Sequence, residues 1–138
     1  MQVSCGTIAC TLVNGEPRYV IVREPRTNYY GFPKGHMESG ESEIETAVRE
    51  TWEEASINVD IVEGFRWENK FRLKSGGTKK VIYFLARFEN QRPCRNLAFE
   101  RLDVLLLPYE KAYAMLEYPE TKKMLFEANE YIKACANF

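Results

Sequence analysis

A dense run of glutamates is the part of this chain that could do chemistry. Seven of them fall between Glu38 and Glu54, where Arg49 is the single basic residue. The segment carries a local charge of −6, whereas the whole chain of 138 residues has a formal net charge of −1. Carboxylate oxygens at this density suit Mg²⁺ or Mn²⁺, which bind a few carboxylates and complete their coordination with water and substrate phosphates.

Three of these acids are expected on one helical face. At 3.6 residues per turn, Glu50, Glu53 and Glu54 span an arc of roughly 100°. Charge alone also allows an acidic, solvated helix face, because like charges four residues apart cost only about 0.2 to 0.5 kcal/mol each. The metal-site hypothesis therefore needs a second observation.

The spacing of the whole segment provides that observation. Five residues separate Gly35 from Glu41, and seven more separate Glu41 from the run 49–57, which reads RETWEEASI. This pattern resembles the Nudix box, G-x5-E-x7-R-E-U-x-E-E-x-G-U with U a large aliphatic residue, the signature of the Nudix (MutT-like) hydrolases. Every charged position is filled. The departures are Thr51 at the first aliphatic position and Ser56, expected at the helix end, in place of glycine.

The resemblance implies an α/β fold, the Nudix α/β/α sandwich with a mixed sheet flanked by helices. It also implies metal-dependent attack of water on phosphorus in a nucleoside diphosphate linked to another moiety. Arg49 would orient the carboxylates by pairing with Glu45 and Glu53, and Glu41 would stabilise the loop–helix junction. The implied metal ligands are the Gly35 carbonyl, Glu50, Glu53, Glu54 and, from a later loop, Glu100.

Two roles stay open at this point. Either Glu50 or Glu100 could be the general base, because that choice depends on distances. Glu100 could equally be a solvent-exposed loop acid.

Shorter strings around the box narrow the resemblance. The loop 32–36 reads FPKGH, the segment 79–86 reads KKVIYFLA, and Glu100, Glu110 and Ala112 keep a ten-and-two spacing. These strings look like those of the animal and archaeal asymmetrical diadenosine tetraphosphate hydrolases. The implied substrate is a small-molecule nucleotide, a dinucleoside polyphosphate.

Basic and aromatic residues supply candidate substrate contacts. Residues 66–80 hold six basic residues and one acid, a local charge of +5 that could face a polyphosphate. The candidate phosphate contacts are Lys34, His36 and Lys79, for which ordinary surface charge is the alternative. Tyr83 lies in the strand that the subfamily uses, and Tyr30 or Tyr118 could stack on adenine, although single aromatics more often belong to a core.

Three other functions remain in view. A triphosphatase that removes damaged nucleotides would share the box, but Lys34 and His36 replace the Gly-Gly or Gly-Lys loop associated with that type. ADP-ribose or nucleotide-sugar pyrophosphatases are often longer dimers. A non-catalytic nucleotide sensor could keep the fold, yet all the acids of the box are present.

Periodicity and turn signals predict the helices and strands that carry these residues. Alternation of Ile8, Cys10 and Leu12 before Asn14-Gly15 predicts a hairpin whose second strand includes 19–22. Residues 24–40 are expected to form a long loop. A helix is predicted over 42–55, capped by Ser39 or Ser42, with an apolar stripe of Ile44, Val48, Thr51 and Ala55. Strands are predicted at 59–73, 81–88 and 104–107, followed by a short helix at 110–116. A last helix begins at Pro119 and has the stripe Leu125, Ala128, Ile132 and Cys135.

Composition and charge limit the number of domains and the kinds of partner and metal site to be expected. An apolar fraction of 45% and a pI near 6.0 suit one domain over 1–138 and argue against bulk attraction to nucleic acid or anionic membranes. No apolar run approaches the roughly 20 residues that span a bilayer. The single histidine excludes multi-histidine zinc sites. We expect a cytoplasmic monomer or weak dimer whose four cysteines, Cys5, Cys10, Cys94 and Cys135, are buried free thiols.

Overall fold

The computed structural model describes residues 1–99, 102–135 and 138. Glu100, the predicted later ligand or base, lies outside the described residues. In chain order the elements are β1 Gln2–Val13, β2 Glu16–Glu24, β3 Tyr29–Gly31, β4 Lys34–His36, α1 Glu43–Ala55, β5 Asp60–Arg72, β6 Thr78–Arg87, β7 Asp103–Pro108, α2 Tyr109–Met115 and α3 Pro119–Ala134.

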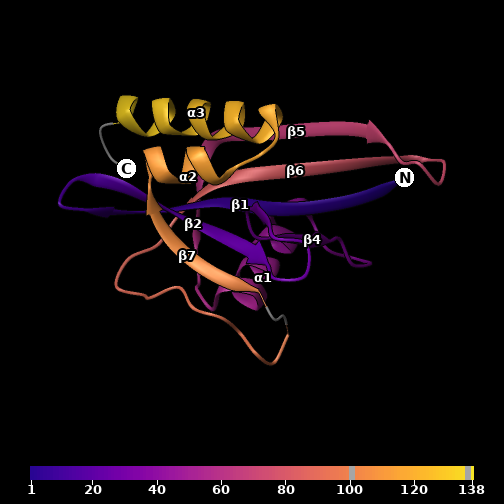
Figure 1. Ribbon diagram of the computed structural model, residues 1–138, viewed down its shortest axis with the longest axis horizontal. Helices are drawn as coiled ribbons and strands as arrows, with labels where there is room; N and C mark the ends of the chain where they lie inside the picture. Colours follow the sequence, from indigo (N-terminus) through magenta and orange to yellow (C-terminus); the bar gives the residue numbers. More distant parts are fainter. Residues whose placement is uncertain (100–101, 136–137) are drawn as a thin grey trace.

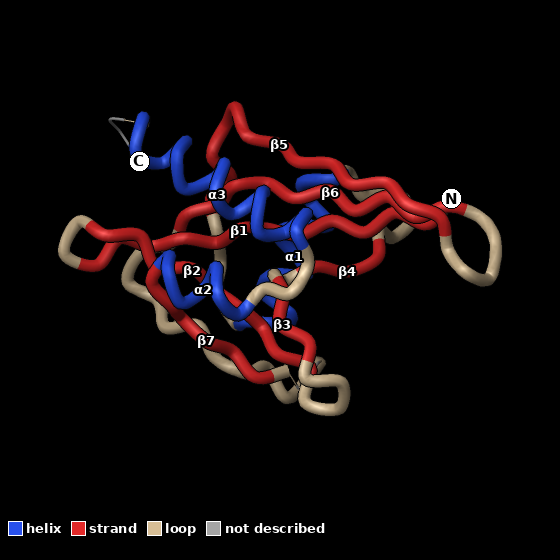
Figure 2. Tube along the Cα trace, turned by 45° about the horizontal axis from the view of Figure 1, so that its top comes forward, coloured by secondary structure: helices blue, strands red, loops and turns tan. Residues whose placement is uncertain are grey.

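A mixed sheet separates two helical layers. Among the described residues, seven strands form one sheet in the order β3-β2-β1-β6-β5, with β4 also paired to β1 and β7 to β2. The β1–β6 pairing is parallel and the other pairings are antiparallel. The helices α2 and α3 cover one face and α1 covers the other (Figures 1 and 2). The predicted α/β/α sandwich is therefore confirmed.

The predicted loop at 24–40 is wrong in part, since it contains β3 and β4. Each strand is three residues long and adds to a strand that already has other partners: β3 pairs with β2, and β4 pairs with β1. Three residues among prolines and glycines are too few to show a period of two. Tertiary pairing creates both strands, so local pattern could not reveal them.

Helix α1 begins and ends as its sequence suggests. Ser42 is the N-cap and forms a capping box with Glu45, and Ser56 ends the helix in the left-handed conformation at φ 60°. The expected buried stripe is only partly correct, because Ile44 is 45% exposed whereas Thr46 and Ala47 are buried. The helix is rotated toward β4, so that the Glu54 side is buried as well.

Apolar side chains fill both spaces between the layers. The larger cluster lies between the sheet and α2/α3 and includes Ile8, Tyr19 and Leu125. Two smaller clusters face α1 and contain Ala55 and Ile82. The α3 stripe follows the prediction except at Cys135, which is the half-buried C-cap.

The expectation of four buried free thiols is only partly correct. All four cysteines are free thiols, but only Cys5 and Cys10 are buried, whereas Cys94 is exposed. None of the helices in the described part of the chain has the length and apolar character needed to cross a bilayer.

A buried hydrogen bond ties α3 to the sheet. The Tyr19 hydroxyl on β2 donates to Oδ1 of Asn129 at 2.6 Å, and both residues are buried. Asn129→Ala leaves this hydroxyl without its acceptor, so we expect the free energy of unfolding to fall by about 1 to 3 kcal/mol in urea titrations. The double variant Tyr19→Phe/Asn129→Ala should lose much less unfolding free energy than the sum of the losses in the two single variants. Additive losses would show that the hydrogen bond contributes nothing.

Candidate active site

The two faces of β4 point to different halves of the site. Lys34 pairs with Gly6, which pairs in turn with Tyr83 and so shares the α3 face of the sheet. Gly35 pairs with Cys5 on the opposite face, toward α1. Because side chains alternate along a strand, adjacent residues of β4 face a cavity on one side and α1 on the other.

Contact between β4 and α1 depends on glycine at position 35, which has no side chain. A Cβ at Gly35 would lie 1.7 Å from Oε2 of Glu50, so the glutamate carboxylate occupies the space that any other residue would fill. The backbone N–H of Lys34 donates to Oε1 of Glu54 at 3.1 Å. Glu54 is only 9% exposed. Two of the predicted metal ligands are therefore packed directly against the strand.

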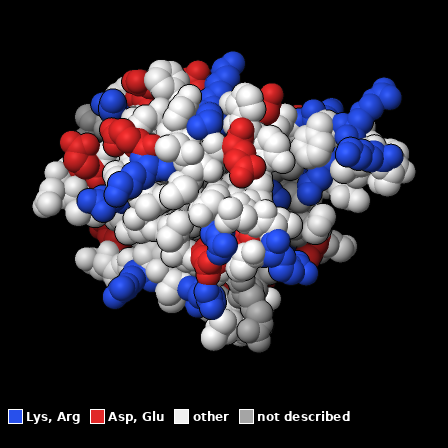
Figure 3. All heavy atoms as spheres, viewed as in Figure 1, with Lys and Arg blue, Asp and Glu red and all other residues white. Residues whose placement is uncertain are grey.

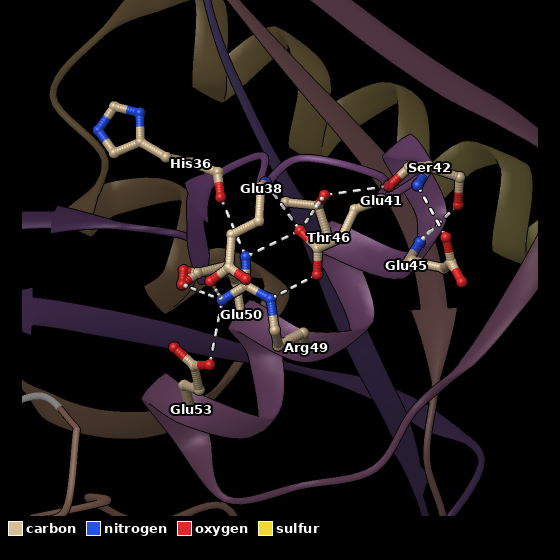
Figure 4. A network of polar contacts seen from close by, with 9 residues as sticks. All are labelled: His36, Glu38, Glu41, Ser42, Glu45, Thr46, Arg49, Glu50 and Glu53. Atoms are coloured by element: carbon tan, nitrogen blue, oxygen red, sulfur yellow. Dashed lines mark hydrogen bonds and ion pairs between the residues drawn. The ribbon is translucent and has the colours of Figure 1, made fainter.

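Arg49 lies at the centre of the acidic cluster (Figure 4). Its Nε donates to Oε2 of Glu41 at 2.6 Å, and its Nη1 lies 3.0 Å from Oε2 of Glu53 and 3.4 Å from Oε1 of Glu50. Its Nη2 also donates to the carbonyl of His36. One guanidinium thus fixes the directions of three carboxylates and ties α1 to β4.

The partners of Arg49 differ in one respect from the prediction. Glu53 pairs with it, but Glu45 instead accepts from the backbone N–H of Ser42 in the capping box. Glu41 takes the place expected for Glu45. The junction role predicted for Glu41 agrees with its contacts, since it also accepts from the backbone N–H of Glu38 and from the Thr46 hydroxyl.

The three glutamates are neighbours without forming one ligand group. Glu50 and Glu53 turn to Arg49, whereas Glu54 turns to β4. Across the described residues, no three His, Cys, Asp or Glu side chains gather as a metal site. The donors are nevertheless hard carboxylate oxygens adjacent to the Gly35 backbone, and this donor set matches the preference of Mg²⁺ or Mn²⁺.

A cavity of about 750 Å³ lies on the α3 side of the sheet. Its floor is formed by β4, β6 and β5, and its walls come from Tyr29 of β3, Tyr118 and the first turn of α3. The lining residues are Tyr29, Lys34, Trp67, Asn69, Lys70, Phe71, Lys79, Val81, Tyr83, Tyr118, Pro119, Glu120, Thr121 and Met124. A volume in the usual range for ligand sites and an aromatic lining suit a nucleoside.

Cations in this cavity face one another. Burial lowers the pKa of the Lys34 ammonium, and the charge of Lys79 lowers it further, while Glu54 and Glu50 act in the opposite direction. Burial holds the pKa of the Tyr83 hydroxyl well above its ordinary value. Two lysines that repel each other in a partly desolvated space favour an anion between them.

Four of the predicted substrate contacts come together in this cavity: Lys34, Lys79, Tyr83 and Tyr118. His36 does not line it; its side chain is exposed and points away from the Arg49 cluster (Figure 4). Tyr30 packs against the larger core cluster. Its neighbour Tyr29 lines the cavity instead, with its ring centroid 5.7 Å from that of Tyr118.

Sequence reasoning missed Tyr29, Trp67, Asn69 and Phe71 as lining residues. The last three alternate on β5, so a strict reading of that strand with period two would have grouped them. Tyr29 could not be told from Tyr30, because the register of β3 is set by pairing with β2.

Basic side chains gather at the end of the β5–β6 hairpin, at the right of Figure 3. Within the predicted basic run, Lys70 and Lys79 line the cavity. Arg66 is instead held by Glu43 of α1 at 3.0 Å and by Glu68 at 3.1 Å. The positive charge near the cavity therefore comes from the outer part of this run.

The close approach at Gly35 can be tested against a second glycine. Gly35→Ala meets only the end of a flexible glutamate, so the Glu50 carboxylate should turn aside and unfolding free energy should change by less than about 1 kcal/mol. Gly6→Ala meets the Pro33 carbonyl oxygen at 2.0 Å and should destabilise by about 1 to 3 kcal/mol. Urea unfolding compares the two variants. Equal losses would mean that the Glu50 side chain cannot turn aside, and would contradict this expectation.

Glu41 should make the stability of the fold sensitive to acid. The Arg49 guanidinium, with hydrogen bonds from Glu38 and Thr46, lowers the pKa of its carboxyl from 4.5 to about 2. A lowered pKa stabilises the folded state above pH 4.5, and that stabilisation is lost as the pH falls toward 2. Glu41→Gln should therefore lower the Tm at pH 7, and the gap to the parent should shrink below pH 4.5. A gap that stays constant from pH 7 to about 3 would contradict this account.

Two known proteins that share one name are similar to this chain. The asymmetrical bis(5'-nucleosyl)-tetraphosphatase of Sus scrofa is 35% identical over 107 residues, which cover 75% of this chain and 72% of that protein. The Mus musculus protein of the same name is 35% identical over 103 residues, covering 72% and 69% of the two chains.

A solved structure is similar in fold over nearly the whole chain. The crystal structure of a C. elegans Ap4A hydrolase binary complex has a TM-score of 0.84 at 23% identity, covering 98% of this chain and 100% of that one. The family model described as NUDIX domain matches residues 5–127, which include β4, α1 and the cavity floor. With that match over most of its length, this chain belongs to the Nudix domain family.

Proposed function

We propose that this chain hydrolyses a dinucleoside polyphosphate, such as diadenosine tetraphosphate, with the help of a divalent cation. The observation that carries the proposal is the junction at β4, where the acids of the box and a cationic, aromatic cavity meet across adjacent residues. The relatives named as asymmetrical bis(5'-nucleosyl)-tetraphosphatases support the same substrate class.

Mg²⁺ or Mn²⁺ is the proposed cofactor, and the residues present fit it. Glu50, Glu53 and Glu54, with the Gly35 carbonyl, would hold the cation, and Glu100 stays a predicted further ligand or base. When bound, such a cation offsets charge on phosphate oxygens and lowers the pKa of water. Arg49 orients Glu50 and Glu53 and balances part of their charge.

The cavity residues would bind and orient the nucleotide. Lys34 and Lys79 would hold phosphate oxygens beside the glutamates, since their mutual repulsion is relieved by an anion between them. Tyr83 forms the floor next to Lys34, and Tyr29 and Tyr118 form an aromatic wall. A carboxylate of the cluster, Glu50 or Glu100, would accept a proton from the attacking water.

The wider setting follows from charge and composition. We infer a cytoplasmic monomer or weak dimer, built as one domain over residues 1–138, with a small-molecule substrate and no stable nucleic-acid partner. A net charge of −1 supports the last point, because a chain near neutrality has no bulk attraction to nucleic acid.

Replacing one box glutamate tests the enzyme directly. Glu54→Gln should lower kcat for diadenosine tetraphosphate by more than the roughly 10- to 100-fold expected of a residue that only orients a ligand. Glu127→Gln, a change at an exposed acid of α3, is the matched control and should keep full activity. Turnover is measured with Mg²⁺ and with Mn²⁺, and products are identified by mass.

The substrate panel decides among the alternatives. Diadenosine tetraphosphate should give ATP and AMP and exceed ADP-ribose and oxidised dGTP in kcat/KM. Preference for either of the other two would replace the proposed substrate, and no metal-dependent turnover of any of them would favour a nucleotide sensor. Full activity of Glu54→Gln would remove the glutamate helix from the mechanism.

A further inference from the structure

The cavity is polarised across the sheet. Lys34, at the β4 side, adjoins the glutamates, whereas four lining residues come from β5: Trp67, Asn69, Lys70 and Phe71. The strands run in the order β4, β1, β6 and β5, so three strand spacings of roughly 4.8 Å, or about 14 Å in all, separate the two sides. With the phosphates at the β4 side, the base at the other end of the nucleotide would lie at the β5 side.

The β5 side holds one side-chain amide between two aromatic rings. Trp67, Asn69 and Phe71 alternate along β5 and line the cavity together. Their register partners on β6 are Tyr83, Val81 and Lys79, all of which line the same cavity. Neighbouring side chains on one face of a strand lie roughly 6.7 Å apart, so the Asn69 amide is flanked by rings on both sides.

Asn69 has hydrogen-bonding capacity that the fold does not use. Its side chain is half-buried, and within residues 1–99, 102–135 and 138 no hydrogen bond engages its amide. It is the one side-chain amide among the described lining residues. An amide presents a donor and an acceptor side by side, and leaving both unpaired in a partly desolvated site is unfavourable.

We propose that Asn69 reads the edge of the nucleobase and sets a preference for adenine. This inference rests on the proposed function and adds a specificity residue to it. The amide Oδ1 accepts from the adenine N6 amino group while Nδ2 donates to the adjacent N7, the pairing that asparagine makes with adenine in nucleic-acid recognition. Guanine presents two acceptors, O6 and N7, on the same edge, so Oδ1 would face an acceptor there.

The flanking rings fix the orientation in which the edge can be read. Aromatic side chains stack on a base face with little regard to which base it is. The rings of the cavity therefore supply affinity, and the amide supplies discrimination. Lys79, opposite Phe71, is left for phosphate.

The test compares Asn69→Leu with the parent on two substrates. One is diadenosine tetraphosphate, and the other is its analogue with unsubstituted purine bases, which lack the N6 amino group. Loss of a bidentate base contact should lower kcat/KM of the variant for the adenine substrate by roughly 5- to 100-fold, mainly through KM. On the purine analogue the change should be clearly smaller, because that substrate makes only one of the two hydrogen bonds.

A control on the same strand isolates the cavity face. Glu68→Gln changes the adjacent residue, which pairs with Ile82 on the α1 side of the sheet, and should leave the ratio of kcat/KM for the two substrates unchanged. If Asn69→Leu does not fold, Asn69→Ala gives the same comparison. Equal losses on both substrates, or no loss on either, would overturn the proposal.

A binding measurement separates this proposal from the proposed hydrolysis. The chain has two tryptophans, so Trp52→Phe leaves Trp67 in the cavity as the only fluorescent indole. In this background, diadenosine tetraphosphate titrated in the presence of EDTA should bind more weakly after Asn69→Leu, whereas the purine analogue should lose less. If the parent binds in EDTA but shows no turnover when Mg²⁺ or Mn²⁺ is supplied, hydrolysis is wrong and base reading stands. Turnover with metal, without an adenine-dependent change in Kd, contradicts base reading alone.

Discussion

The site depends on how closely β4 lies against α1. Gly35 has no side chain, and the Glu50 carboxylate fills that space, so a three-residue strand can carry the helix's acids at one face and a cavity cation at the other. The Lys34 N–H bound to Glu54 fixes the same contact from the backbone. Moving β4 by one residue would exchange the two faces and separate the acids from the cavity. The register of β4 therefore keeps the acids of α1 next to the cavity.

Arg49 offsets part of the repulsion among the acids of α1 and its preceding loop. Its guanidinium contacts Glu41, Glu50 and Glu53, so carboxylates that would repel one another are held by one charge. The same arrangement explains why they do not already form a ligand group: each points to the arginine or to β4. A cation would compete with Arg49 for Glu50 and Glu53 while Glu41 keeps the arginine in place, which lets the cluster change partners without unfolding.

The sequence predicts the layers and the box well, because each depends on local signals. Asn14-Gly15 marks the first hairpin, Ser42 and Glu45 mark the start of α1, and Pro119 marks the start of α3. It fails where tertiary contacts decide. The two short strands exist only through pairing, α1 is rotated away from its Ile44 stripe, and Tyr29 rather than Tyr30 lines the cavity because β2 sets the register of β3. The alternation of Trp67, Asn69 and Phe71 was present in the sequence, but only the sheet order shows which face it serves.

Anomalous scattering from crystals grown with Mn²⁺ and a non-hydrolysable dinucleoside tetraphosphate would test the account most directly. We expect manganese peaks in contact with carboxylates of Glu50, Glu53 or Glu54, phosphates between Lys34 and Lys79, and a base over β5. Manganese bound elsewhere on the chain, or a nucleotide outside the cavity while the α1 carboxylates stay on Arg49, would contradict the claim that β4 joins these two halves into one site.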